Sequence, residues 1–231
     1  MVTNHLKGEN MLISEASKFR RLSTSASLII WPLLMAGAAL AQPKMGQTAA
    51  DVYQAASSEP SRLTESIIIG LPGILLWIIA VVGMVHLVRQ KGVVLVHIGG
   101  LFALFGALGH MIIVTLYLVL QGIPSNTDSS VLILAVDRIS HHVFPVAMPL
   151  LFLGAIGIFL LALALRRAGI APIATPILVG LSIVTEFIPF PGITGDVVTW
   201  VLVFVGLGFV SASIQKMDNL AWDSGSVKAL R

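Results

Sequence analysis

Two long apolar runs joined by four residues decide the fold of this chain: SIIIGLPGILLWIIAVVGMVHLV (Ser66–Val88) and VVLVHIGGLFALFGALGHMIIVTLYLVL (Val93–Leu120), with RQKG (Arg89–Gly92) between them. A helix needs about 20 apolar residues to cross a hydrocarbon core of about 30 Å. Each run meets that length, and four residues leave room only for a tight reversal. The stretch therefore predicts two transmembrane helices that pack as an antiparallel hairpin.

The composition of the whole chain agrees with a membrane protein. Of its 231 residues, 56% are hydrophobic and 11% are charged, whereas a soluble domain carries about 25% charged residues. The net charge of +3 comes from basic residues in short gaps between apolar runs. This distribution excludes the clustered basic face of a nucleic-acid-binding protein. Because the chain has no cysteine, disulfides and thiolate metal sites are excluded as well.

The same length criterion predicts an all-α fold, a polytopic bundle of six transmembrane helices. The four further apolar runs are Ser25–Ala41, Val143–Leu165, Ala171–Ile188 and Val197–Ile214. We expect residues 1–24 to form a cytoplasmic N-terminal segment, 25–214 the bundle, and 215–231 a cytoplasmic C-terminal tail. The polar segment Gln42–Glu65 is expected to be the first external loop.

The basic residues predict the orientation of the bundle, because positively charged loops stay in the cytoplasm. With both termini inside, eleven basic residues are cytoplasmic: Lys7, Lys18, Arg20, Arg21, Arg89, Lys91, Arg166, Arg167, Lys216, Lys228 and Arg231. Only Lys44, Arg62 and Arg138 then lie outside. We therefore expect both termini to be cytoplasmic.

The first apolar run has a second interpretation. In KFRRLSTSASLIIWPLLMAGAALAQP (Lys18–Pro43) a basic region and an apolar region precede Ala39-Leu40-Ala41, which is the form of a signal-peptidase site. Cleavage there would leave five helices and an external N-terminus. We expect an uncleaved anchor, and the cleaved form remains the alternative.

One face of the Val93–Leu120 helix is predicted to pack against the rest of the bundle. Gly99, Ala103, Gly106, His110, Ile113 and Tyr117 recur at spacings of three and four residues, which places them on one stripe. Small residues on a membrane helix mark a close contact with another helix. His110 and Tyr117 should therefore point into the bundle.

The predicted orientation gathers four candidate ligands near the external face. His110 lies in the outer half of its helix, His141 and His142 at the outer lip of the Val143–Leu165 helix, and Glu186 in the outer third of Ala171–Ile188. An ionisable side chain within a span is costly and is a functional candidate by default. These four are the candidate metal ligands.

Three further residues are expected to support this pocket. Asp137 precedes His141 by four residues, so its carboxylate can accept a hydrogen bond from the imidazole and orient it. Ser182 lies on the stripe that ends at Glu186, and Tyr117 lies on the stripe of His110. All three are candidates for a supporting role.

The leading functional interpretation is a non-catalytic helical membrane subunit or scaffold with a His/Glu-lined pocket near the external face. A haem- or metal-binding electron-transfer protein is the first alternative, because imidazole binds haem iron and divalent transition metals. In a two-haem form His86 would pair with His97 on the inner side. A proton-coupled transporter or channel, with Glu186 and His110 titrating, is the second alternative. The sequence has no nucleophile motif, phosphate loop or multi-histidine box, so it gives an enzyme no support.

The expected partners follow from the same reading. The lipid bilayer is the first, and the small-residue stripes would also suit partner membrane subunits or a homo-oligomer. No nucleic acid is expected. Because the layout resembles that of many small bacterial multi-spanning proteins, we expect the cytoplasmic (inner) membrane of a bacterium.

Overall fold

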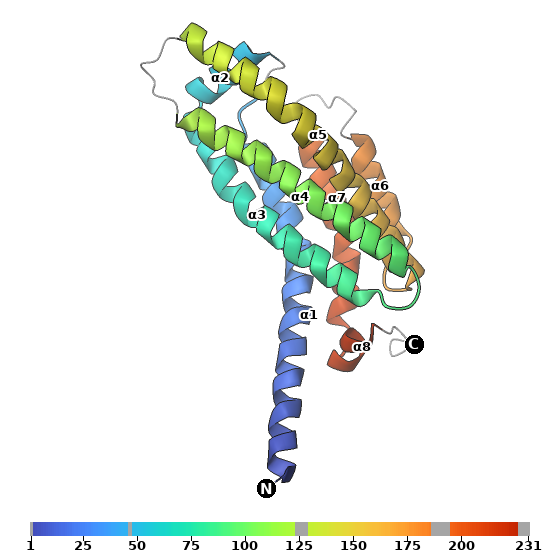
Figure 1. Ribbon diagram of the computed structural model, residues 1–231. Helices are drawn as coiled ribbons and strands as arrows, with labels where there is room; N and C mark the ends of the chain where they lie inside the picture. Colours follow the sequence, from blue (N-terminus) through green and yellow to red (C-terminus); the bar gives the residue numbers. More distant parts are fainter. Residues whose placement is uncertain (1, 46–47, 123–128, 186–194, 226–231) are drawn as a thin grey trace.

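The computed structural model describes residues 2–45, 48–122, 129–185 and 195–225, with side chains described from Glu15 onward. The regular secondary structure in this part of the chain is all helical (Figure 1). The helices are α1 (Val2–Ala41), α2 (Ala49–Ser58), α3 (Pro60–Leu87), α4 (Val93–Gln121), α5 (Ser129–Arg167), α6 (Ala174–Thr185), α7 (Gly195–Gln215) and α8 (Asn219–Ser224).

Six of these helices form a closed ring. Each contacts the next in the order α1, α3, α4, α5, α6 and α7, and α7 returns to α1. Neighbours along the chain run in opposite directions, so the predicted α3–α4 hairpin is confirmed (Figure 1). Its turn reverses at Gly92, whose φ of +90° is a backbone conformation that glycine adopts without steric cost. A ring of antiparallel helices leaves a central axis, and the candidate site lies on it.

The expectation of an apolar membrane bundle is confirmed in its general form. Five helices are long and apolar enough to cross a bilayer: Glu15–Ala41, Pro60–Leu87, Val93–Gln121, Ser129–Arg167 and Gly195–Gln215. The run predicted as Ala171–Ile188 appears as α6, whose described part is shorter than a full span. The bundle thus has five candidate spans among the residues described, with α6 as a sixth, apolar member of the ring.

Three boundaries differ from the predicted ones. The segment Gln42–Glu65 is not simply a loop, because it holds α2 and the first turns of α3. α1 begins at Val2 rather than at Ser25, and α5 begins at Ser129 rather than at Val143. Hydropathy marks only the apolar part of a helix, and each of these helices continues into polar sequence beyond it.

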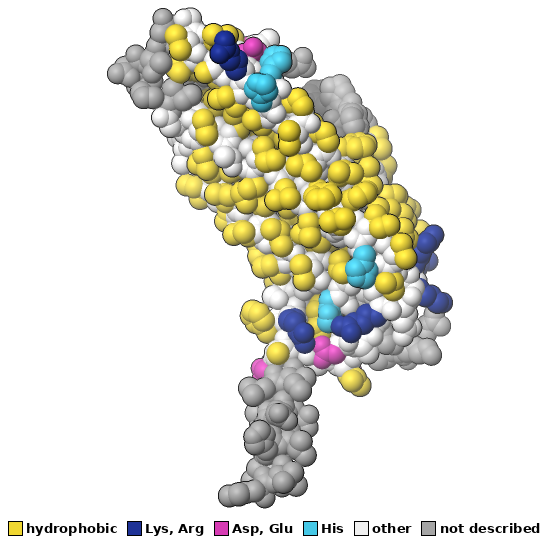
Figure 2. Space-filling model, in the orientation of Figure 1, with side chains coloured by type: hydrophobic (Ala, Val, Ile, Leu, Met, Phe, Trp, Pro, Cys, Tyr) yellow, Lys and Arg dark blue, Asp and Glu magenta, His cyan; other side chains and the backbone are white. Residues whose placement is uncertain are grey.

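The beginning of α1 and helix α8 lie at the same end of the bundle, which we call the basic end (Figure 1). The surface between the two ends is a broad apolar band, with charged side chains gathered above and below it (Figure 2). At the basic end Asp223 of α8 accepts a hydrogen bond from the Ser17 hydroxyl. Its carboxylate also forms an ion pair with the Arg20 guanidinium at 3.4 Å. A band of this kind is the surface that a bilayer covers.

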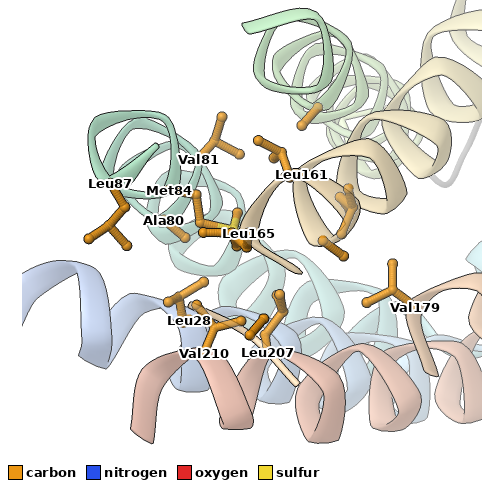
Figure 3. Close-up of a cluster of buried hydrophobic side chains, with 14 of the residues drawn as sticks. Leu28, Ala80, Val81, Met84, Leu87, Leu161, Leu165, Val179, Leu207 and Val210 are labelled. Carbon is orange, nitrogen blue, oxygen red and sulfur yellow. The ribbon is translucent and has the colours of Figure 1, made fainter. Parts of the chain in front are cut away.

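The half of the bundle nearest the basic end is a solid core (Figure 3). Side chains from five helices meet there with almost no exposed surface; those labelled in Figure 3 are Leu28, Ala80, Val81, Met84, Leu87, Leu161, Leu165, Val179, Leu207 and Val210. Dispersion between such closely packed atoms is weak singly and large in sum. This half therefore holds the helices of the ring together, so the opposite half can contain a cavity.

Helices α4 and α5 approach each other through glycines, as the small-residue stripe predicts. Gly99, Ala103 and Gly106 are all buried. A Cβ built on Gly106 would lie 2.5 Å from the Cα of Gly154, and one on Gly157 would lie 2.7 Å from the carbonyl oxygen of Gly99. Real Cβ atoms do not come this close to backbone, so only glycine permits this crossing.

Helix α1 is an integral part of the ring. Leu28 and Trp31 are fully buried, and Ser25 exchanges hydrogen bonds with Ser211 of α7, with 2.8 Å between the two hydroxyl oxygens. Cleavage after Ala41 would remove these core side chains. The packing therefore favours the expectation of an uncleaved anchor, which stays a prediction.

At the end opposite the basic end, α2 lies against α5. A capping box starts this helix: the Asp51 N–H donates to the Thr48 hydroxyl at 3.2 Å, and the Asp51 carboxylate accepts from the Thr48 N–H at 3.1 Å. The hydrogen bonds from Thr48 hold the pKa of Asp51 below its ordinary value. Val52 and Tyr53 then pack beside Leu116 and Val136, so α2 covers the ends of α4 and α5.

Candidate functional site

A cavity of about 590 Å³ occupies the ring in the half away from the basic end. Every helix of the ring contributes to its wall, from Met35 on α1 to Val203 on α7. Most of the lining is aliphatic or aromatic, with a few polar side chains: Gln42, Ser66, His110, Tyr117, Ser182, Asp196 and Thr199. Small-molecule sites have this size and this composition.

Four aromatic rings from four helices pack together at the cavity, and three of them, those of Trp77, His110 and Trp200, line it. Trp31 stacks on Trp77 with their centroids 4.8 Å apart and their planes at 20°. Trp200 meets Trp31, Trp77 and His110 edge to face at 5.4, 5.9 and 5.7 Å, and His110 meets Trp77 in the same way at 5.1 Å. Such pairs are stabilised by the ring quadrupoles in addition to their buried area. The four rings hold α1, α3, α4 and α7 in a fixed relation around the cavity.

His110 presents a hydrogen-bond acceptor to the cavity. Its Nδ1 lies 2.9 Å from the carbonyl oxygen of Gly106 one turn earlier, so Nδ1 carries the proton and Nε2 has a free lone pair in the neutral imidazole. The side chain is partly exposed although it lies deep in the bundle, because it lines the cavity. No partner of Nε2 is found among the residues described. A ligand hydroxyl can donate to this atom.

Tyr117 supplies the complementary group nearer the end opposite the basic end. Its hydroxyl oxygen accepts a hydrogen bond from Nε2 of Gln42 at 2.7 Å, so the hydroxyl hydrogen remains to be donated. Tyr117 is seven residues after His110 on α4, which places it two turns, or about 10 Å, further along the helix. The cavity therefore offers an acceptor and a donor at different depths on one wall.

The opposite wall carries hydroxyl groups that bond to backbone carbonyl oxygens and to one another. The hydroxyl oxygens of Thr185 and Thr199 are 2.8 Å apart, and both lie within bonding distance of the Ser182 carbonyl oxygen, at 2.7 and 3.1 Å. The Ser182 hydroxyl donates to the Val179 carbonyl oxygen at 2.7 Å. These bonds join α6 to α7, and they leave His110, Tyr117 and Ser66 as the polar groups available to a ligand.

The structure does not bring the predicted metal ligands together in one place. His110 lies in the cavity wall, whereas His141 and His142 are exposed on the part of α5 away from the basic end. Glu186 lies outside the described residues. The Nδ1 of His141 is 3.0 Å from the backbone oxygen of Asp137 and 3.6 Å from its carboxylate. The nearer partner is thus the backbone oxygen, and the carboxylate is beyond hydrogen-bond distance. Across residues 15–45, 48–122, 129–185 and 195–225 no three metal-binding side chains lie together.

His86 and His97, the pair expected in a two-haem form, contact different residues. The ring of His86 lies 5.2 Å from that of Trp222 and contacts the Arg89 guanidinium at 3.0 Å. His97 is exposed, and its Nδ1 lies 2.8 Å from the Val93 carbonyl oxygen. Neither histidine lines the cavity.

Several residues of the site carry no signal of their own in the sequence. Trp77 and Trp200 read as ordinary apolar positions, and Gln42 lies in the segment predicted as a loop. Trp31, Trp77 and Trp200 each occur within an apolar run, which could have suggested a shared centre. Their convergence depends on the ring order of the helices, which only the tertiary structure supplies.

No family model, no curated protein and no solved structure matches this chain.

Proposed function

We propose that this protein is a non-catalytic membrane protein that binds a small, largely apolar molecule in its central cavity. The observation that carries the proposal is the cavity itself, with the unpartnered Nε2 of His110 in its wall. Its volume of about 590 Å³ lies within the range of about 300–1,000 Å³ typical of ligand sites. The set of polar groups in the cavity wall is small, so the ligand must be mostly hydrocarbon.

The arrangement around His110 favours binding over catalysis. A histidine that acts as a general base is oriented by a carboxylate and lies within reach of a nucleophile. Here Nδ1 bonds to a backbone carbonyl oxygen. On the opposite wall, the Ser182 hydroxyl donates to a backbone carbonyl oxygen, and the Thr199 hydroxyl bonds to the Ser182 carbonyl oxygen and to the Thr185 hydroxyl. His110 is therefore suited to holding a ligand hydroxyl.

Replacing His110 with alanine should weaken the binding of 4-octylphenol about tenfold, since one buried hydrogen bond contributes about 0.5–1.5 kcal/mol. The measurement is a scintillation proximity assay with tritiated 4-octylphenol and the purified protein. The probe 4-octyltoluene has the same shape but no hydroxyl, and its affinity should be unaffected by the substitution.

His97→Ala is the matched control. His97 lies on the same helix and makes the same bond to the carbonyl oxygen four residues earlier, but it lies outside the cavity. Its replacement should leave both affinities unchanged. If His110→Ala binds the phenol as tightly as the parent protein, or if neither probe binds the parent protein, the proposed function is wrong.

We further propose that the basic end of the bundle faces the cytoplasm, as the distribution of lysine and arginine favours. Since the chain has no cysteine, single introduced cysteines can show on which side of the membrane a position lies. In right-side-out vesicles a membrane-impermeant maleimide should label Lys44→Cys at once and Ala16→Cys only after permeabilisation. Both positions are exposed. The opposite labelling pattern would contradict the orientation, and a mature chain that begins at Gln42 would establish cleavage after Ala41.

A further inference from the structure

We infer that the ligand reaches the cavity sideways, from the hydrocarbon of the bilayer, through the seam between α5 and α6. This inference rests on the proposed function. It assigns the ligand to a chemical class: a membrane-dissolved amphiphile with an aliphatic body and a hydroxyl or protonated acid group. The argument depends on where the cavity wall is itself exposed on the outer surface.

Only three of the described lining residues are exposed, and two of them are neighbours on one face of α5. Met148 and Phe152 both line the cavity and are 49% and 53% exposed. The lining residues of α1, α3 and α4 are buried or only partly exposed. The cavity therefore reaches the side of the bundle at Met148 and Phe152.

The seam is closed nearer the basic end, where a phenylalanine fills it. A Cβ built on Gly180 of α6 would lie 3.2 Å from the ring of Phe159, so Phe159 packs directly on α6. Phe152 precedes Phe159 by seven residues and therefore lies on the same face of α5, two turns further out. Ile183 follows Gly180 by three residues and also lines the cavity. The opening is thus bordered by Phe152 on α5 and Ile183 on α6.

The surface around this opening is apolar. On α5 the exposed neighbours include Val146, and on α6 they include Ile177, Leu181 and Val184. Exposed aliphatic side chains on these helices belong to the apolar band of the bundle, which lies between its charged ends (Figure 2). An opening in this band meets lipid tails rather than water. A molecule that uses it must already be dissolved in the bilayer.

The third exposed lining residue, Asp196, marks the competing route. It lies in the first turn of α7 at the end of the cavity away from the basic end, where a water-soluble molecule would arrive. A water-soluble ligand would have to pass this carboxylate, and a lipid-dissolved one would not. The two routes are therefore separated by which of Phe152 and Asp196 borders the path.

The test uses Phe152→Cys and Asp196→Cys, each compared before and after reaction with N-(1-pyrenyl)maleimide and reconstitution into phosphatidylcholine vesicles. Pyrene at position 152 should slow both association and dissociation of 4-octylphenol at least tenfold, because it blocks the path. Pyrene at position 196 should slow neither rate to this extent, because the path does not pass that residue. Leu101→Cys, exposed on α4 away from the cavity, is the matched labelling control.

Two results would overturn the inference. Slowing by pyrene at position 196 alone would establish an aqueous route. Unaltered rates for pyrene at position 152 would show that the seam is not the path. In either case tight binding to the unlabelled protein would leave the proposed function intact, whereas no binding to the unlabelled protein would be the failure of the proposed function.

Discussion

Replacing Gly157 with alanine is expected to destabilise the bundle by about 3 kcal/mol, at the upper end of what overpacking costs in a close-packed interior. The new Cβ would lie 2.7 Å from the carbonyl oxygen of Gly99, and closer still to the backbone nitrogen of Ala103. Both atoms are helical backbone, which cannot rotate away as a side chain can. The two helices would have to separate along their whole contact.

The measurement is an SDS titration in mixed micelles, followed by far-UV circular dichroism. Gly208→Ala is the matched control, because Gly208 is also within a transmembrane helix but a Cβ there would lie 3.8 Å from Ile29. Alanine costs about 1 kcal/mol less than glycine in a helix interior, so this variant should be as stable as the parent or more so. Equal stability of the two variants would contradict the glycine crossing of α4 and α5.

The stripe that contains Gly99 and Gly106 could be predicted because it depends only on helical period. Residues at spacings of three and four share a face in any helix, and small residues on a membrane helix are useful mainly where another helix comes close. The same argument placed His110 and Tyr117 toward the interior, and both line the cavity. Helical period and residue size together were sufficient to predict which face of α4 points into the bundle.

The two histidines of α5 show what period alone cannot supply. Phe144, Met148, Leu151 and Phe152 line the cavity, and His141 lies one turn before Phe144 on the same stripe. Its side chain is nevertheless 75% exposed, because the cavity ends before this turn. How far a cavity extends along a helix depends on the neighbouring helices, so depth inferred from hydropathy was too coarse to decide it.

The boundaries of α2 and α5 were missed for a related reason. Polar residues are read as loops when lipid is assumed to be the only partner of a helix. α2 is held by its own capping box and by the apolar cluster at the ends of α4 and α5. Neither of these requires a long apolar run.

Replacing Trp77 with alanine is expected to cost about 3–5 kcal/mol of stability, the range for removing a large aromatic side chain from a packed core. Trp77 is 1% exposed and touches Trp31, Trp200 and His110. Lipid tails are as apolar as the bundle interior, so little of this cost is transfer from water. The cost is instead lost van der Waals contact and the lost ring pairs.

The SDS titration used for Gly157 also measures this effect, with Trp77→Phe as the conservative variant. Phenylalanine keeps a ring against Trp31 and should lose less than half as much stability as alanine. A double-mutant cycle with Trp31→Ala should give a coupling of about 1 kcal/mol, because each tryptophan loses its stacking partner when the other is removed. Fully additive losses would mean that the stack contributes nothing of its own. Because Trp77 lies between the solid core and the cavity, a void at this position adjoins space that is already empty, so collapse of the surrounding side chains cannot offset the loss.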